Sequence, residues 1–171
     1  MIAIKSEEYV QKFIGITSSV EGDKLVAGYA LKAILNNKGH DTEDAYFLNS
    51  KSGELISHYK LGELGGSIEL PKLKKDEKLI LIHNHPNSAS FSFRDFVTTN
   101  NFPEIETMIA AGHDGTVYFL SVSEGKRLVI TDNNEYNHYR NAWSRLYRDN
   151  GGDCGALTII SKELGWIYHV K

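Results

Sequence analysis

The sequence predicts an α/β protein in which a mixed β-sheet is flanked by helices. Residues 78–85 are strand-like, and the run Leu79-Ile80-Leu81-Ile82 is apolar at every position, as in a central strand covered on both faces. Along the chain, segments with apolar residues at helical spacing alternate with short strand-like segments. The chain has 171 residues, of which 41% are hydrophobic, and this is enough for the packed core of one domain.

The N-terminal part of the chain is expected to supply one helix and a hairpin. Residues 1–20 are weakly patterned and are expected to form an opening strand or loop. A helix is expected over about 20–36, because apolar residues recur there at helical spacing after Ser19, a good capping residue. Residues 44–49 and 54–59 are expected to pair across a turn.

The segment after the central strand is expected to contain two helices followed by a hairpin. A short helix is expected near 93–101, and a second one over 103–110 with Pro103 near its first turn. Residues 116–123 and 127–131 are expected to pair as a hairpin.

The last part of the chain is expected to be mainly helical. Helices are expected over about 133–149 and 155–164, followed by an extended segment at 166–170. We therefore divide the chain into a main domain at 1–132 and a C-terminal helical extension at 133–171, packed on that domain or appended to it.

Composition narrows the classes of function. With 19 Lys and Arg against 22 Asp and Glu, the net charge of −3 makes nucleic acid an unexpected partner. The single cysteine, Cys154, excludes a disulfide framework and a cysteine-rich zinc finger and fits a reducing compartment. No apolar run could span a membrane, and Glu7 and Glu8 stand where a signal peptide would be apolar, so we expect a cytoplasmic protein with no membrane partner. The oligomeric state stays open.

Two histidines end the predicted central strand. His83 and His85 are two positions apart, so their imidazoles point to the same side, at the strand end where open α/β sheets place their sites. Ser92 and Asp95 follow at the start of the next predicted helix, which can fold back over the histidines. Two imidazoles and one carboxylate leave one position of a tetrahedral zinc ion open, the arrangement of a catalytic site.

A purely structural explanation covers part of this pattern. Ser92-x-x-Asp95 also fits a capping box, in which both side chains satisfy backbone amides. That explanation leaves the two histidines without a reason, because buried imidazoles need partners. Asn84 points to the opposite face of the strand and is interpreted as structural. A nucleobase deaminase, which needs Pro-Cys-x-x-Cys, is excluded by the single cysteine.

The run from His83 to Pro86, which reads His-Asn-His-Pro, together with Ser92 and Asp95 resembles the signature of the JAB/MPN (JAMM) metalloprotease family. That signature is His-x-His-Pro, a short spacer and Ser-x-x-Asp, with a glutamate well upstream. The His-Asn-His-Pro form is most similar to bacterial members, including the RadC-like branch and the JAB domains of phages and mobile elements. The resemblance covers about residues 24–131.

One departure concerns the spacer. The segment 86–91 between the second histidine and the serine is one residue shorter than the common family spacer. Ser90 also precedes Ser92 by two positions, so a second serine is available for the role that the family gives to this one.

The resemblance implies a cytidine-deaminase-like fold and the hydrolysis of a peptide or isopeptide bond by a metal-activated water. It implies that His83, His85 and Asp95 bind Zn²⁺ and that Ser92 donates a hydrogen bond to the oxyanion of the tetrahedral intermediate. It further assigns residues 1–132 to the metalloprotease-like domain.

The family also implies an upstream glutamate as the general base. Glu43 is our choice, since it stands where the chain leaves the first helix and enters a strand. Asp41, Asp44 and Glu54 are the alternatives.

The implied partner is a protein or peptide substrate, such as a ubiquitin-like protein or a phage structural protein. Three other functions stay open at this point: a catalytically silent binding module of the same fold, a phage or mobile-element assembly factor, and a RadC-like protein associated with DNA.

Overall fold

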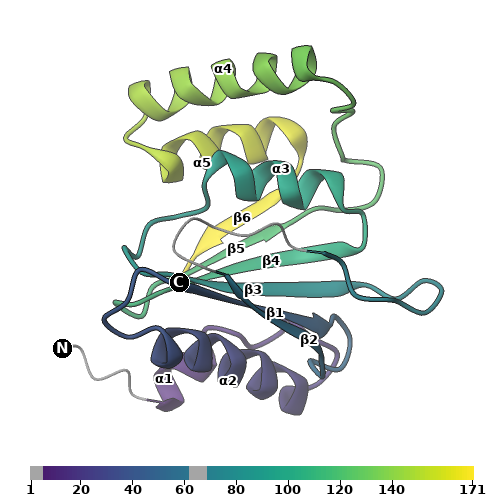
Figure 1. The fold of residues 1–171 in the computed structure, drawn as a ribbon, viewed down its shortest axis with the longest axis vertical. Helices are drawn as coiled ribbons and strands as arrows, with labels where there is room; N and C mark the ends of the chain where they lie inside the picture. The colour runs from purple at the N-terminus through teal and green to yellow at the C-terminus, as the bar shows by residue number, and fades with distance from the viewer. Residues whose placement is uncertain (1–5, 62–68) are drawn as a thin grey trace.

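The computed structural model describes residues 6–61 and 69–171, and in this part of the chain six strands form one mixed sheet covered by five helices (Figure 1). This confirms the predicted fold class. In order along the chain, the elements are α1 (Ser6–Gln11), α2 (Val20–Asn36), β1 (Glu43–Asn49), β2 (Leu55–Leu61), β3 (Leu79–His85), α3 (Phe93–Asn101), β4 (Ile105–Gly112), β5 (Val117–Ser121), α4 (Asn133–Asp149), α5 (Asp153–Leu164) and β6 (Ile167–Val170).

Strand β3 is central, as the sequence predicts. The strand order is β2-β1-β3-β4-β5-β6, and all seven residues of β3 are buried. It pairs with β1 antiparallel and with β4 parallel, and the parallel connection runs through α3. Burying a Leu or Ile side chain contributes about 1.5–3 kcal/mol, so the four apolar residues at its start anchor the sheet.

The two faces of the sheet carry separate cores. Leu79 and Leu81 pack in a cluster with residues of α3 and α5, whereas Ile80 and Ile82 pack in a cluster with residues of α2. Figure 1 shows the corresponding layers, with α1 and α2 on one face, α3 and α5 on the other, and α4 outermost. Since strand side chains alternate, His83 and His85 share the face of Leu81.

Four of the predicted helices and the first hairpin are confirmed. Ser19 caps α2, and its hydroxyl accepts a hydrogen bond from the backbone amide of Gly22 at 3.0 Å. β1 and β2 pair antiparallel across the turn at 50–53, and α3, α4 and α5 begin within two residues of the expected positions.

The predicted helix over 103–110 is wrong: residues 103 and 104 lie in a turn, and strand β4 begins at Ile105. Its residues from Met108 to Gly112 are all buried. The parallel ladder with β3, which runs from Leu79–Ile105 to His85–Gly112, satisfies its backbone groups and overrides the helical character of the sequence.

The predicted strand at 127–131 is also wrong. β5 pairs antiparallel with β4 on one side and with β6, from the end of the chain, on the other. Residues 127–131 instead form a loop in which the Arg127 guanidinium donates to the carbonyl oxygens of Thr99, Asn100 and Ile105.

The expectation of a strand or loop at the N-terminus is wrong for residues 6–11, which form α1; residues 1–5 lie outside the described residues. Tyr9 and Phe13 are buried, and the Phe13 ring contacts that of Phe119 on β5 with centroids 5.6 Å apart. This burial stabilises a helix too short to be stable alone.

The C-terminal segment contributes to the sheet and to its core. β6 is the edge strand beside β5, and Ala156, Leu157 and Trp166 belong to the same apolar cluster as Leu81. The division of the chain at residue 132 stays a prediction. None of the helices in residues 6–61 and 69–171 combines the length and the apolar character that crossing a membrane requires.

Candidate metal centre

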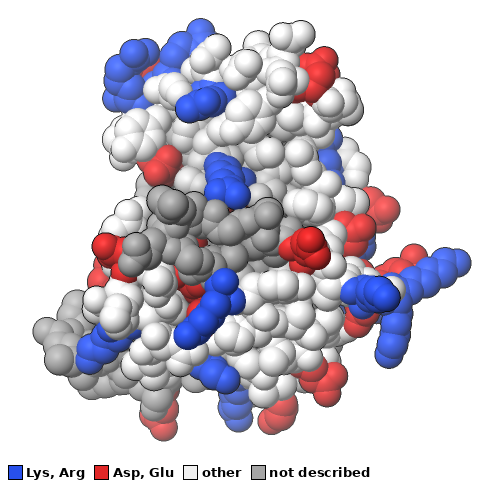
Figure 2. Space-filling model, in the orientation of Figure 1, with Lys and Arg blue, Asp and Glu red and all other residues white. Residues whose placement is uncertain are grey.

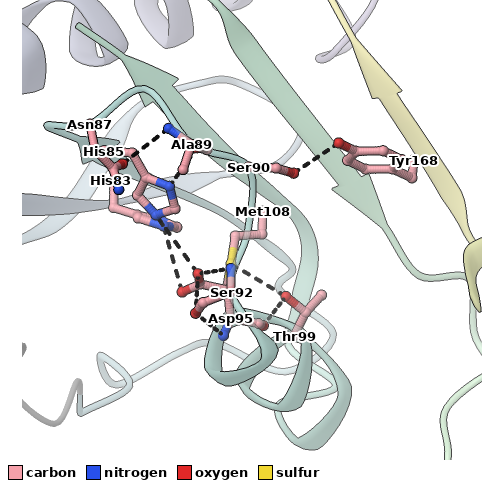
Figure 3. A network of polar contacts seen from close by, with 10 residues as sticks. All are labelled: His83, His85, Asn87, Ala89, Ser90, Ser92, Asp95, Thr99, Met108 and Tyr168. Atoms are coloured by element: carbon pink, nitrogen blue, oxygen red, sulfur yellow. Dashed lines mark hydrogen bonds and ion pairs between the residues drawn. The ribbon is translucent and has the colours of Figure 1, made fainter. Parts of the chain in front are cut away.

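Strand β3 and helix α3 bring the three predicted ligands together (Figure 3). The Nε2 atoms of His83 and His85 are 2.8 Å apart, and they lie 3.6 Å and 3.7 Å from the two carboxylate oxygens of Asp95. Zinc–ligand bonds of 2.0–2.1 Å in tetrahedral geometry would separate neighbouring ligand atoms by about 3.3 Å. The three distances bracket this value, so the group could hold a metal ion with small side-chain adjustments.

The capping box of α3 fixes the Asp95 carboxylate. Oδ2 of Asp95 accepts hydrogen bonds from the Ser92 backbone amide at 2.8 Å and from the Ser92 hydroxyl at 2.7 Å, while the Asp95 amide donates to the same hydroxyl at 3.3 Å. The structural explanation for these residues is therefore correct, and it coexists with the ligand cluster. The same carboxylate caps the helix and faces the imidazoles.

The loop after β3 orients the second imidazole. Nδ1 of His85 lies 2.8 Å from the carbonyl oxygen of Ala89. Because a carbonyl oxygen only accepts, Nδ1 carries the proton, and the lone pair of Nε2 faces His83 and Asp95. A metal-ligating histidine commonly has such a partner on its other nitrogen. Ala89 gives no sequence signal, since it contributes only its backbone.

Burial sets the protonation states of the cluster. His83 is 4% exposed, and this burial lowers the pKa of its imidazole from 6.5 to about 4, although the nearby Asp95 charge opposes the shift. Burial would raise the pKa of Asp95, but its electrostatic interactions with His83 and His85 and the hydrogen bonds from Ser92 outweigh burial and lower the pKa. A neutral imidazole and a carboxylate are the forms that bind metals.

Glu43, the expected general base, lies at the start of β1 on the ligand face. Ala45 lies opposite His83 in the β1–β3 ladder, and Glu43 comes two residues earlier. Its carboxyl interacts electrostatically with His85 and Asp95. Burial raises the pKa of Glu43, the Asp95 charge raises it further, and His85 and Arg94 oppose the rise.

The competing acids are placed differently. Asp44 points to the α2 face, where its Oδ2 lies 3.3 Å from Nε2 of His58. Glu54 is bound to Ser52 in the β1–β2 turn, at the other end of β1. Asp41 is exposed in the connection between α2 and β1.

The two candidate serines are also separated by the structure. The Ser92 hydroxyl donates to the predicted ligand Asp95, whereas the Ser90 hydroxyl lies 2.8 Å from the hydroxyl of Tyr168 on β6 (Figure 3). The Ser92 hydroxyl proton is used within the capping box. Its role toward a substrate oxyanion stays a prediction.

Comparisons of the chain with models of protein families, with curated proteins and with solved structures give no match. The resemblance to the JAB/MPN family therefore stays a prediction that rests on the motif.

Asp153 is a neighbour of the cluster that sequence reasoning missed. It begins α5, and its carboxyl interacts electrostatically with Asp95 and His85. Burial raises its pKa, while a hydrogen bond of 3.1 Å from Nε1 of Trp143 opposes the rise. No spacing in the sequence links Asp153 to the motif, because the fold of the C-terminal segment brings it there.

Proposed function

We propose that this protein is a zinc-dependent hydrolase of JAB/MPN type that cleaves peptide or isopeptide bonds. The observation that carries this proposal is the convergence of His83, His85 and Asp95 within 4.8 Å of one another, with Glu43 on the same face of the sheet. The motif of these residues and its resemblance to the family support the same reaction.

His83, His85 and Asp95 would hold the ion, and their two nitrogens and one oxygen suit zinc. When bound, zinc supplies a Lewis acid for the substrate carbonyl and lowers the pKa of a water molecule towards about 7. Three protein ligands would leave a position open for a water molecule or the substrate.

Glu43 takes the proton from the attacking water and gives it to the leaving amine. Burial raises the pKa of the Glu43 carboxyl and makes it a stronger base than an exposed one, which favours its taking up the proton of the water. Ser92 stabilises the oxyanion once its hydroxyl turns away from Asp95, since a donor aimed at the developing charge lowers the barrier.

The proposed substrate is a peptide or an isopeptide-linked protein, with ubiquitin-like and phage structural proteins as the first classes to test. The proposed location is the cytoplasm, where the single cysteine, Cys154, stays reduced. Figure 2 shows basic and acidic side chains interspersed on the face in view, and the net charge is −3. These features favour a protein substrate over the DNA-associated alternative.

The direct test is hydrolysis by zinc-loaded protein of a peptide library and of isopeptide-linked ubiquitin-like conjugates. We expect cleavage that stops when the zinc is removed by a chelator and returns when zinc is restored. Zinc-loaded protein that binds these substrates without cleaving them would favour the silent binding module instead.

A further inference from the structure

Asn84 stands between the two histidine ligands in the sequence and points to the opposite face of the sheet. It is completely buried, in a strand whose other buried positions are mostly apolar. A primary amide has two N–H donors and two acceptor lone pairs, and a buried one needs partners for all of them. The structure supplies four.

Two of these partners are backbone groups of β1 and of the residue before it. Oδ1 of Asn84 accepts a hydrogen bond from the Asp44 amide at 2.8 Å, and Nδ2 donates to the Thr42 carbonyl oxygen at 3.0 Å. The remaining two are side chains: Nδ2 of Asn37 donates to Oδ1 at 3.3 Å, and Nε2 of His113 lies 3.1 Å from Nδ2.

The two backbone partners flank Glu43. The Thr42 carbonyl belongs to the peptide group before the Cα of Glu43, and the Asp44 amide belongs to the peptide group after it. Since peptide groups are planar, holding both of them fixes the two backbone dihedrals of Glu43 and thus the direction of its side chain.

Asn84 acts where the backbone ladder stops. The last pair between β1 and β3 at this end is Ala45–His83. One residue further along β1, the amide of Asp44 bonds to the side chain of Asn84. The side-chain amide of Asn84 thus takes the place of the next backbone pair of the ladder. It holds the start of β1 beside the end of β3 that carries His83 and His85.

The side chain of Asn84 also contacts the C-terminal end of α2. Asn37, the residue after α2, donates from Nδ2 to the Ala33 carbonyl at 2.9 Å, and its Oδ1 accepts from the Thr42 hydroxyl at 2.5 Å. The connection from α2 to β1 is therefore tied at both ends to Asn84.

We propose that Asn84 is a positioning residue that aims Glu43 at the metal centre, an inference that rests on the proposed function. One strand then performs both tasks: His83 and His85 bind the ion on one face, and Asn84 sets the direction of the general base from the other. Strand β3 therefore determines how the ion and the general base lie relative to each other.

The test compares Asn84→Ala and Asn84→Asp with the wild type. Asn84→Ala removes both backbone bonds, whereas Asn84→Asp keeps an acceptor for the Asp44 amide and loses the donor to Thr42. His113→Ala is the matched control, because it removes a partner of Asn84 without touching either peptide group of Glu43.

Two readouts separate positioning from folding. With zinc, we expect both Asn84 variants to keep one ion per chain and to lose about 10- to 100-fold in kcat with little change in KM, as for a misplaced catalytic group. With Co²⁺ in place of zinc, the pseudocontact shifts of the Glu43 side-chain methylenes should change in both variants, and His113→Ala should match the wild type.

Three results would overturn the inference. Unchanged Glu43 pseudocontact shifts and wild-type kcat in folded Asn84 variants would leave Asn84 a merely structural residue. Loss of zinc in parallel with activity would show that it acts through the ligands. A wild type that binds neither metal would overturn the proposed function and this inference with it. If Asn84→Ala does not fold, Asn84→Asp alone decides the outcome.

Discussion

Ala45 of β1 lies directly opposite His83 of β3 in the antiparallel ladder. Because strand side chains alternate, this pairing places Glu43, His83 and His85 on one face of the sheet. A shift of one residue in the register would turn Glu43 to the α2 face and bring Asp44 to the ligands. The register between β1 and β3 therefore determines that Glu43, and not Asp44, lies on the face of the candidate metal centre.

Removing a ligand is expected to release the ion. His83→Ala and Asp95→Ala each leave two ligands, and zinc affinity should fall by more than about 100-fold, since even the loss of a partner that only orients a ligand costs 10- to 100-fold. Zinc titration by calorimetry measures this, with His40→Ala as the control at an exposed histidine. Wild-type affinity in either ligand variant would refute the ligand set.

Removing the general base is expected to separate binding from catalysis. Glu43→Gln should bind zinc as the wild type does and lose about 10²- to 10⁴-fold in kcat, because the amide cannot accept the proton. Glu54→Gln, at the other end of β1, is the control and should keep its activity. Undiminished hydrolysis by Glu43→Gln would move the base to another acid, and Asp153 is then the next to test.

The Ser92 hydroxyl is expected to matter for both the helix and the site. Ser92→Ala loses the side-chain N-cap of α3, at a cost of about 1 kcal/mol, and removes one of the two hydrogen bonds that hold Oδ2 of Asp95, since the bond from the backbone amide of residue 92 remains. Zinc affinity should fall by about 10- to 100-fold. Thermal unfolding and zinc titration measure the two effects, with Ser90→Ala as the comparison. Unchanged affinity would mean that the capping box does not orient the ligand.

The metal-free protein is expected to lose stability on acidification. Burial lowers the pKa of His83 from 6.5 to about 4, so between these values the unfolded chain binds more protons than the folded one. The free energy of unfolding should therefore fall as the pH drops through this window, by up to about 3 kcal/mol from this residue.

Urea unfolding of chelator-treated protein at pH 7 and pH 4.5 measures this fall. The fall should be smaller in His83→Ala, which lacks the buried imidazole. An equal fall in wild type and variant would show that His83 does not contribute to it.

The sequence predicts the parts of the fold and site that local chemistry determines. The apolar run before His83 marks the central strand, and Ser92 with Asp95 marks the start of α3, because alternation and capping act over a few residues. The spacing of the ligands follows from the same two elements.

The parts that depend on distant partners were predicted wrongly or missed. Residues 105–112 form a strand because β3 lies beside them, and β5 pairs with β6 rather than with 127–131 because the chain returns from α5. Ala89 orients His85 through its backbone, and Asp153, from the C-terminal segment, interacts electrostatically with Asp95 and His85. Neither interaction has a signature in the local sequence.

The most direct test of the metal centre is an anomalous-difference map from crystals of zinc-loaded protein, with data collected on both sides of the zinc absorption edge. The account predicts one peak, about 2.0–2.2 Å from Nε2 of His83, Nε2 of His85 and a carboxylate oxygen of Asp95. Zinc-loaded crystals in which these three side chains enclose no peak would contradict it.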